Sequence, residues 1–191
     1  MKRIILIIAI AFCVFQMVVL AVNIDIGMPA IDRASTAPEY TWVNIGNPAN
    51  ESGTITSIEI WANSALTNCE VATFYVVSGN NLSTRDTEVI GSVTGHSKQT
   101  FVVNLDVQVG DYIGAYYTVG LLERDSSGFG GCWMNTGDCI PCTNITFTLR
   151  AGEAISLYGT GATVAAGIKW NTVTISKWNG QVITKLNGLS H

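Results

Sequence analysis

Beyond residue 22, the apolar residues follow the alternation typical of β-strands, not the three-to-four spacing of helices. Short apolar or alternating runs are separated by Gly, Asn, Ser and Asp, which favour turns. Over Thr54–Ala62, isoleucines alternate with polar residues, as in a strand with one buried face. The pattern predicts strands over Ile24–Ile26, Thr41–Ile45, Thr54–Ala62, Cys69–Val77, Thr87–Thr94, Thr100–Leu105, Tyr112–Val119, Gly131–Met134, Thr146–Leu149 and Ala154–Tyr158.

Short strands at this spacing, without helices, predict an all-β fold. The arrangement we expect is an antiparallel two-sheet β-sandwich, with a jelly roll as the preferred topology. The sandwich domain is expected to span residues 22–161. A chain of about 170 residues is large enough to form one domain with a real core.

The N-terminus carries two cations, Lys2 and Arg3, followed by an apolar stretch that ends at Val22. This predicts a signal peptide over residues 1–21, cleaved near Ala21. Because the stretch is long enough to cross a bilayer, an uncleaved anchor is the alternative. Cleavage would place the protein outside the cell or at a cell or virion surface, with no further contact to a membrane.

Removal of the leader also removes Lys2 and Arg3, so the formal charge changes from −4 to −6. An acidic surface repels the phosphate backbone, so we expect no nucleic-acid partner. The chain is only 13% charged and 48% hydrophobic, which indicates a folded chain and not a disordered one.

The C-terminal segment repeats with a period of eight residues. Lys169–Ser176 is followed by Lys177–Thr184, and a partial copy runs over Lys185–His191. Asn179-Gly180 and Asn187-Gly188 are strong two-residue hairpin signals. We therefore expect a β-repeat tail over residues 169–191, joined to the domain by a flexible segment over 162–168. Repeats this short usually serve a shape or an assembly.

A tail of this size cannot build a core alone, so its large apolar residues need another surface. We expect that surface to belong to a second copy, in a homo-oligomer or helical polymer formed by exchange of a terminal strand. An ordinary edge strand within its own domain is the alternative. The candidate contacts from the mature N-terminus and the tail are Ile24, Ile26, Met28, Trp170, Val173, Ile175, Trp178, Val182, Ile183 and Leu186.

Cys13 lies in the leader, which leaves an even number of cysteines in a chain expected to reach an oxidising compartment. We predict disulfides, with all three pairings open. A zinc site is less favoured because a single C-x-x-C pair is present, so we expect no metal and no cofactor. The disulfide candidates are Cys69, Cys132, Cys139 and Cys142.

Three Asn-x-Ser/Thr sequons fall where loops or strand edges are expected, at Asn50, Asn81 and Asn144. In an exported β-domain these are candidate glycosylation sites, if the host has the machinery.

No catalytic arrangement emerges from the sequence. The only histidines are His96 and His191, and the nucleophile motif Gly-x-Ser-x-Gly is missing. Glu59 and Glu70 lie in alternating strands and are interpreted as solvent-facing. We therefore expect no enzyme.

A lectin-like binding module is the alternative function. In that case Trp61, Phe129 and Trp133 would stack on sugars, and Asn63 or Asp125 would add polar contacts. For Phe129 and Trp133, a cap over the open end of the sandwich is favoured over a sugar-stacking platform.

The runs Gly53–Ala62 and Gly110–Gly114, with Ile31–Arg33 and Ile155–Gly159, resemble a β-sandwich module common in environmental and viral proteins. The similarity covers about Ile24 to Gly161. The tail resembles the Ile-Ser-Lys-x-Asn-Gly repeats at the ends of phage and virion structural proteins. Together these features resemble subunits of extracellular fibrils, and the resemblance implies a secreted structural protein that assembles with itself.

Overall fold

The structure is a computed structural model that describes residues 21–163. The predicted leader and the repeat tail lie outside the described residues, as do all seven candidate contact residues of the tail. The described part is all-β: thirteen strands, each paired antiparallel with its neighbours, and no helix. This confirms the predicted all-β antiparallel class.

The strands vary from two residues to 26 residues in length. In chain order they are β1 (Asn23–Gly27), β2 (Ser35–Ala37), β3 (Thr41–Asn44), β4 (Gly53–Ser78), β5 (Asn81–Val93), β6 (Ser97–Val107), β7 (Tyr112–Tyr116), β8 (Val119–Asp125), β9 (Cys132–Asn135), β10 (Ile145–Thr146), β11 (Thr148–Arg150), β12 (Ala154–Ile155) and β13 (Leu157–Ala162).

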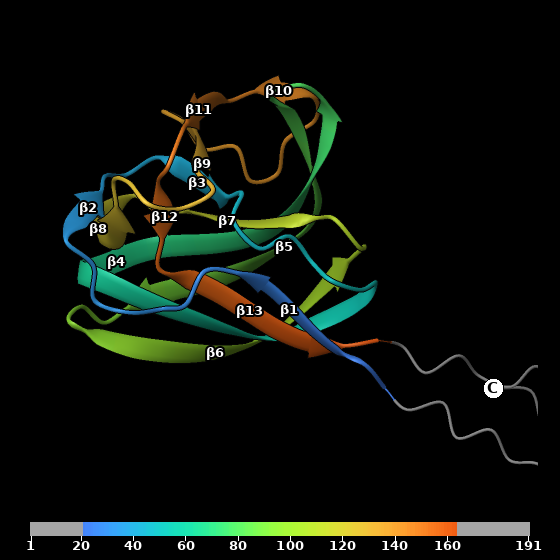
Figure 1. The fold of residues 1–191 in the computed structure, drawn as a ribbon. Helices are drawn as coiled ribbons and strands as arrows, with labels where there is room; N and C mark the ends of the chain where they lie inside the picture. The colour runs from blue at the N-terminus through green and yellow to red at the C-terminus, as the bar shows by residue number, and fades with distance from the viewer. Residues whose placement is uncertain (1–20, 164–191) are drawn as a thin grey trace, which may run out of the picture. The chain divides into compact units, whose positions relative to one another are not determined.

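The long strand β4 organises the fold. Its first half pairs with β13 on one side and β6 on the other. Its second half pairs with β7 and β5, and its middle pairs with β8. Several register shifts interrupt these ladders, and such irregularities let a strand bend. Through β4 all the strands form one connected sheet with the path β1-β13-β4-β7-β3-β9-β11 (Figure 1).

Two apolar clusters form the core. The larger one takes side chains from both halves of β4, including Ile55, Ile58 and Val71, and also Ile113 of β7. The smaller one surrounds Phe74 at the far end of β4. The alternation that predicted the first half of β4 is present from Ile58 onward, because Ile58, Ile60 and Ala62 are buried whereas Glu59 and Trp61 are half-buried. A register shift between Ile55 and Ser57 changes the phase, so Ile55 is buried as well.

The main differences from the predicted strands lie where the chain bends. Two predicted strands, Thr54–Ala62 and Cys69–Val77, are one continuous strand, because the segment between them stays paired with β8. The strand predicted to end at Val119 stops at Tyr116, and β8 begins separately. At Gly120 φ is +104°, and a Cβ would lie 2.2 Å from the Ala65 carbonyl oxygen, so this position requires glycine.

Candidate functional site

The two ends of the described chain lie side by side. Strands β1 and β13 pair along their whole length (Figure 1). Beyond them, the Thr163 amide donates to the Val22 carbonyl at 3.0 Å, and the Val22 amide donates to Thr163 Oγ1 at 2.9 Å. The strand that follows the predicted leader and the strand that precedes the predicted tail are therefore neighbours.

The structure places the N-terminal contact candidates in the chain's own core. Ile24 and Ile26 are 1% and 0% exposed, and Met28 is half-buried. The prediction that these residues contact another subunit is therefore corrected for Ile24 and Ile26: strand alternation turns them toward their own domain, and β13 already pairs with their backbone.

The outer edge of β1 is closed by two asparagine side chains. Asn50 accepts from the Asp25 amide at 3.0 Å and donates to the Asn23 carbonyl at 3.1 Å. Asn47 donates to the Gly27 carbonyl, and its own backbone carbonyl accepts from the Gly27 amide. Because an amide side chain both donates and accepts, it replaces a neighbouring strand at this edge. The Asn50 nitrogen, which a glycan would use, is engaged in this edge.

The outer edge of β6 is closed differently. Among residues 21–163, β6 pairs with β4 alone. On its other side, two carboxylates of β5 accept from its backbone: Glu88 from the Asn104 amide at 2.7 Å, and Asp86 from the Asp106 amide at 2.9 Å. Charged side chains that cover an edge strand are a common protection against unwanted pairing. We call β6 residues 98–106 with Asp86 and Glu88 the acidic edge.

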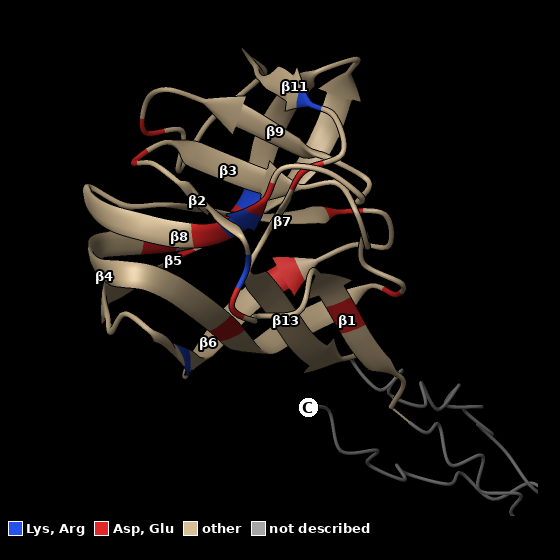
Figure 2. Ribbon diagram, turned by 60° about the vertical axis from the view of Figure 1, so that its left-hand side comes forward, with Lys and Arg blue, Asp and Glu red and all other residues tan. Residues whose placement is uncertain are grey.

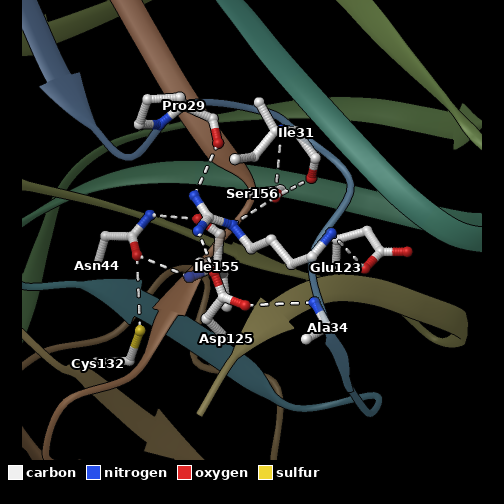
Figure 3. A network of polar contacts seen from close by, with 10 residues as sticks. Pro29, Ile31, Ala34, Asn44, Glu123, Asp125, Cys132, Ile155 and Ser156 are labelled. Atoms are coloured by element: carbon white, nitrogen blue, oxygen red, sulfur yellow. Dashed lines mark hydrogen bonds and ion pairs between the residues drawn. The ribbon is translucent and has the colours of Figure 1, made fainter. Parts of the chain in front are cut away.

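A buried arginine holds the segment that follows β1 (Figure 3). The Arg33 side chain is 1% exposed, and its guanidinium donates to Ser156 Oγ, to the Asp125 carboxylate at 2.7 Å and to the Pro29 carbonyl. The Arg33 backbone amide donates to Glu123. Each of these polar groups has a hydrogen-bond partner within the protein. We therefore interpret the cluster as structural and not as a reactive site.

A polar side chain joins β12 and β13 to β3 nearby (Figure 3). Asn44, 1% exposed, donates to the Ile155 and Leu157 carbonyls, and its oxygen accepts from the Ile155 amide and the Cys132 thiol. Its polarity within the apolar run of β3 was the only signal for this role in the sequence.

The other described cations are also paired with carboxylates. Arg85 binds Asp111 and lies over the ring of Tyr75, in the same way that Arg33 lies over Phe129. Acidic positions spread over several strands, whereas Lys and Arg positions are few (Figure 2). The remaining pairs are Arg124–Glu153, Arg150–Glu153 and Lys98–Glu59.

The candidate sugar-binding aromatics do not form one platform. Trp133 is 7% exposed, stands edge-on to Tyr112 at 4.9 Å between ring centroids, and donates through its indole nitrogen to Asn80. The structure therefore contradicts the alternative role of Trp133 in sugar stacking, because its ring fills the smaller apolar cluster. Phe129, 37% exposed, covers the Arg33 guanidinium, and Trp61 is half-buried on β4.

The polar partners expected for a sugar are engaged within the protein. Asn63 donates to Glu123 at 2.8 Å, and Asp125 binds Arg33. An open hollow of about 630 Å³ lies beside β1 and β13, where Asp25, Asn50 and Tyr158 contribute to its mainly polar wall. Burial raises the pKa of Tyr158, and the neighbouring Asp25 carboxylate, 3.4 Å from its hydroxyl, adds to the effect.

The four predicted disulfide cysteines are free thiols in the structure. Cys69 and Cys132 lie in the larger apolar cluster, whereas Cys139 and Cys142 lie in or against the smaller one. Burial raises the pKa of Cys69 and of Cys132 to about 12, with the charges of Glu70 and Glu153 adding to it. Burial also raises the pKa of Cys139 and Cys142. Such thiols are poor nucleophiles near neutral pH.

The two remaining sequons face each other. Asn81 donates to the Asn144 side-chain oxygen at 3.3 Å, and Thr146 donates to Asn81 at 2.8 Å, across the pairing of β5 with β10. Asn144 is exposed and Asn81 is half-buried. The structure therefore brings together two candidate glycosylation sites that lie far apart in the sequence.

Within residues 21–163, no group of His, Cys, Asp and Glu side chains is placed to hold a metal ion. The same part of the chain contains no helix with the length and hydrophobicity needed to cross a membrane. Comparisons with protein-family models, with curated proteins and with solved structures found no match to this chain.

Proposed function

We propose that the chain is a secreted structural subunit of an extracellular fibre or appendage, at a cell or virion surface, whose copies join through the repeat tail. The observation that carries the proposal is that the described domain has a polar interior with its hydrogen bonds satisfied. Among the described residues, no buried side-chain nitrogen or oxygen lacks a hydrogen-bond partner. Apolar tail residues such as Trp170 and Trp178 therefore need a surface elsewhere.

The joining step that we propose is β-augmentation by a terminal strand. A short alternating segment adds to a free sheet edge, so that main-chain hydrogen bonds provide affinity and alternate side chains provide register. The first strand of the domain is already used, because β1 pairs with β13 and its outer edge is covered by Asn47 and Asn50. The tail is therefore the donor in this proposal.

The proposal includes a jelly-roll-like sandwich, in which the two halves of β4 contribute to two facing layers. The composition of the larger apolar cluster supports this. Ile58 of the first half and Val71 of the second half belong to it together with Leu105 of β6 and Ile113 of β7. Side chains from both ladders pack into one core, as expected for layers that face each other.

A lectin-like function has less support. Of its five candidate residues, Trp133 is buried, and Asn63 and Asp125 already bind residues of the same chain. A screen of the purified protein on immobilised glycans would reveal such a function directly.

The test of the proposal uses the chain from Val22 to His191 and two matched variants. Ile175→Asp places a charge on the apolar face of the tail, and Thr174→Asp places the same charge on its polar face. We expect filaments or large oligomers from the unaltered chain and from Thr174→Asp, and a single-copy species from Ile175→Asp, by sedimentation velocity and negative-stain microscopy. A monomeric unaltered chain contradicts the proposal.

A further inference from the structure

We propose that the acidic edge accepts the repeat tail of a second copy: one octapeptide repeat, 169–176 or 177–184, adds as a strand to the outer side of β6, beside Asp86 and Glu88 of β5. This inference rests on the proposed function and names the surface at which the exchanged strand is received. It follows from the charge of the two parts, the state of the sheet edges, the apolar residues at the seam and the length of the tail.

The charges of the domain and the tail are opposite. All fourteen Asp and Glu lie within residues 21–163, together with five Lys and Arg, which gives this part a formal charge of −9. The tail contains Lys169, Lys177 and Lys185 and no acid. Each of the five cations in the domain is already paired with a carboxylate of the domain. The lysines of the tail are therefore a cationic complement for the carboxylates that remain.

Two of those carboxylates occupy the position at the β6 edge where a pairing strand would bind. Glu88 and Asp86 accept from the amides of Asn104 and Asp106, which a pairing strand would otherwise contact with its carbonyls. Neither carboxylate has an ion-pair partner within residues 21–163. The backbone of an incoming strand would replace the two carboxylates at these amides. A lysine at the end of that strand would then form ion pairs with the released carboxylates.

Several apolar side chains of β5 and β6 are only partly covered within the described domain. Val102 and Val89 are 90% and 72% exposed, the highest values among the large hydrophobic residues of the described part. Phe101 and Ile90 are only partly buried against the main core. Because neighbouring residues of a strand point to opposite faces, Val102 and Val89 lie on the solvent face, and Phe101 and Ile90 lie on the core face. The apolar face of a tail strand, with Val173 and Ile175, would extend the core beside Phe101 and Ile90.

Two other edges, at β1 and β11, fit the tail less well. At β1, Asn47 and Asn50 satisfy both donors and acceptors, and the adjacent Ile24 and Ile26 leave no apolar surface to cover. Strand β11 pairs with β9 alone in the described part, but it is only three residues long, too short to pair with a whole repeat.

The lengths also agree. One octapeptide repeat spans about 26 Å when extended, and the 11 residues of β6 span about 36 Å. One edge therefore has room for a single repeat, whereas the tail holds two full copies and a partial one. Each copy carries both a donor and an acceptor at different places, so the contact is head-to-tail and can continue from copy to copy.

The experiment places a photo-crosslinking amino acid, p-benzoylphenylalanine, at position 102 in the chain from Val22 to His191. Chains labelled with ¹⁴N and ¹⁵N are mixed before assembly, and crosslinked peptides are identified by mass spectrometry. Matched controls carry the same group at Val119 of β8 or Leu149 of β11, which are 55% and 49% exposed. We expect crosslinks from position 102 to residues 169–184 in mixed-isotope pairs, and none to the tail from the controls.

A charge exchange provides a second readout. Asp86→Lys with Glu88→Lys should weaken assembly about tenfold, because like charges then meet at the edge. Adding Lys169→Glu and Lys177→Glu to the same chain should restore it. Glu39→Lys with Glu51→Lys makes the same change of charge at two exposed positions elsewhere and should leave assembly unaltered.

The outcomes separate this inference from the proposed function. If filaments form and depend on Ile175, but position 102 does not crosslink to the tail, the acceptor is wrong and the structural function stands. If position 102 reacts only within single-isotope pairs, the tail covers its own domain, and the second copy is wrong. If the unaltered chain stays monomeric and shows no mixed-isotope crosslink, both proposals fail.

Discussion

Two sheet edges of this domain are closed by side chains of opposite character. At β1, Asn47 and Asn50 donate to backbone carbonyls and accept a backbone amide, as a neutral strand would. At β6, Asp86 and Glu88 only accept, and they bring negative charge to the edge. An amide pair is a complete replacement for a strand, whereas carboxylates are a partial one.

The difference indicates which of the two edges stays closed and which one can accept a further strand. The residues behind the β1 edge are fully buried, and the segment after it is held by Arg33. The residues beside the β6 edge include Val102 and the half-buried Phe101. We interpret the β1 edge as closed permanently by its own domain. We interpret the β6 edge as protected by negative charge until it pairs with a cationic strand.

The largest effect is expected from Arg33, which fixes the chain just after β1. Arg33→Ala leaves Asp125 without its partner and should lower the free energy of unfolding by about 3–5 kcal/mol, measured by urea denaturation. Arg150→Ala is the control, because this 44% exposed side chain also pairs with a carboxylate and should cost less than about 1 kcal/mol. Equal effects of the two changes would contradict a special role for Arg33.

The next comparison tests the two edges directly. Ile26→Ala removes a fully buried side chain from β1 and should lower the free energy of unfolding by about 2–5 kcal/mol. Val102→Ala on β6 should change it by less than about 0.5 kcal/mol, because the side chain is 90% exposed. A large loss from Val102→Ala would show that the β6 side is covered within its own domain.

The free energy of unfolding at alkaline pH tests whether water is excluded from the core beside the acidic edge. Cys69 lies opposite Gly91 of β5, and its pKa is about 12 in the folded protein against an ordinary value of 9.0. The folded state therefore holds the thiol proton more tightly, so its contribution is complete below pH 9 and is lost as the pH rises towards 12. Between pH 8 and pH 10 we expect a loss of about 1 kcal/mol from this thiol.

Urea unfolding under reducing conditions at both pH values measures this loss. Between these pH values, the free energy of unfolding should fall less in Cys69→Ala than in the unaltered chain, whatever the absolute stability of the variant. Identical slopes would mean that water reaches Cys69 from the seam.

The asparagine cap of β1 should have a smaller effect. Asn50→Ala removes two hydrogen bonds at a partly solvated edge and should cost about 1 kcal/mol. Asn104→Ala, at an exposed position of β6, should cost less than about 0.5 kcal/mol. Thermal unfolding of the two variants checks the difference, and no difference would mean that Asn50 does not act as a strand substitute.

The smallest change in stability is expected at the acidic edge. Asp86→Ala with Glu88→Ala returns two β6 amides to water and should cost less than about 1 kcal/mol. Hydrogen exchange at Asn104 and Asp106 should accelerate, while exchange in β1 stays unaltered. A loss above 3 kcal/mol would show that the carboxylates are integral to the domain.

The sequence predicted the fold class because alternation is strong in this chain. The first half of β4 shows it most clearly, with Ile58, Ile60 and Ala62 buried and the residues between them half-buried. The sequence did not predict that β4 is continuous or where β8 begins. Both features depend on long-range strand pairing near Gly120 and not on the local pattern of apolar residues. The strand β2 escaped because its three residues, Ser35–Ala37, carry no alternation that separates them from a loop.

The candidate site was harder to predict. Trp133 looked available for sugar stacking within a glycine-rich segment, and only its packing against Tyr112 shows that it is core. The roles of Asn50, Asp86 and Glu88 depend on which backbone edges remain unpaired, and that information exists only in the folded topology. Acidic residues at alternate positions 86 and 88 were the one available signal, since charges often protect edge strands.

The most direct test of the account is amide hydrogen exchange in the assembled chain and in the Ile175→Asp chain. The account predicts slower exchange over β6, Ser97–Val107, in the assembled form, with β1, Asn23–Gly27, equally protected in both. A gain of protection in β1 without one in β6, or no difference at either edge, would contradict it.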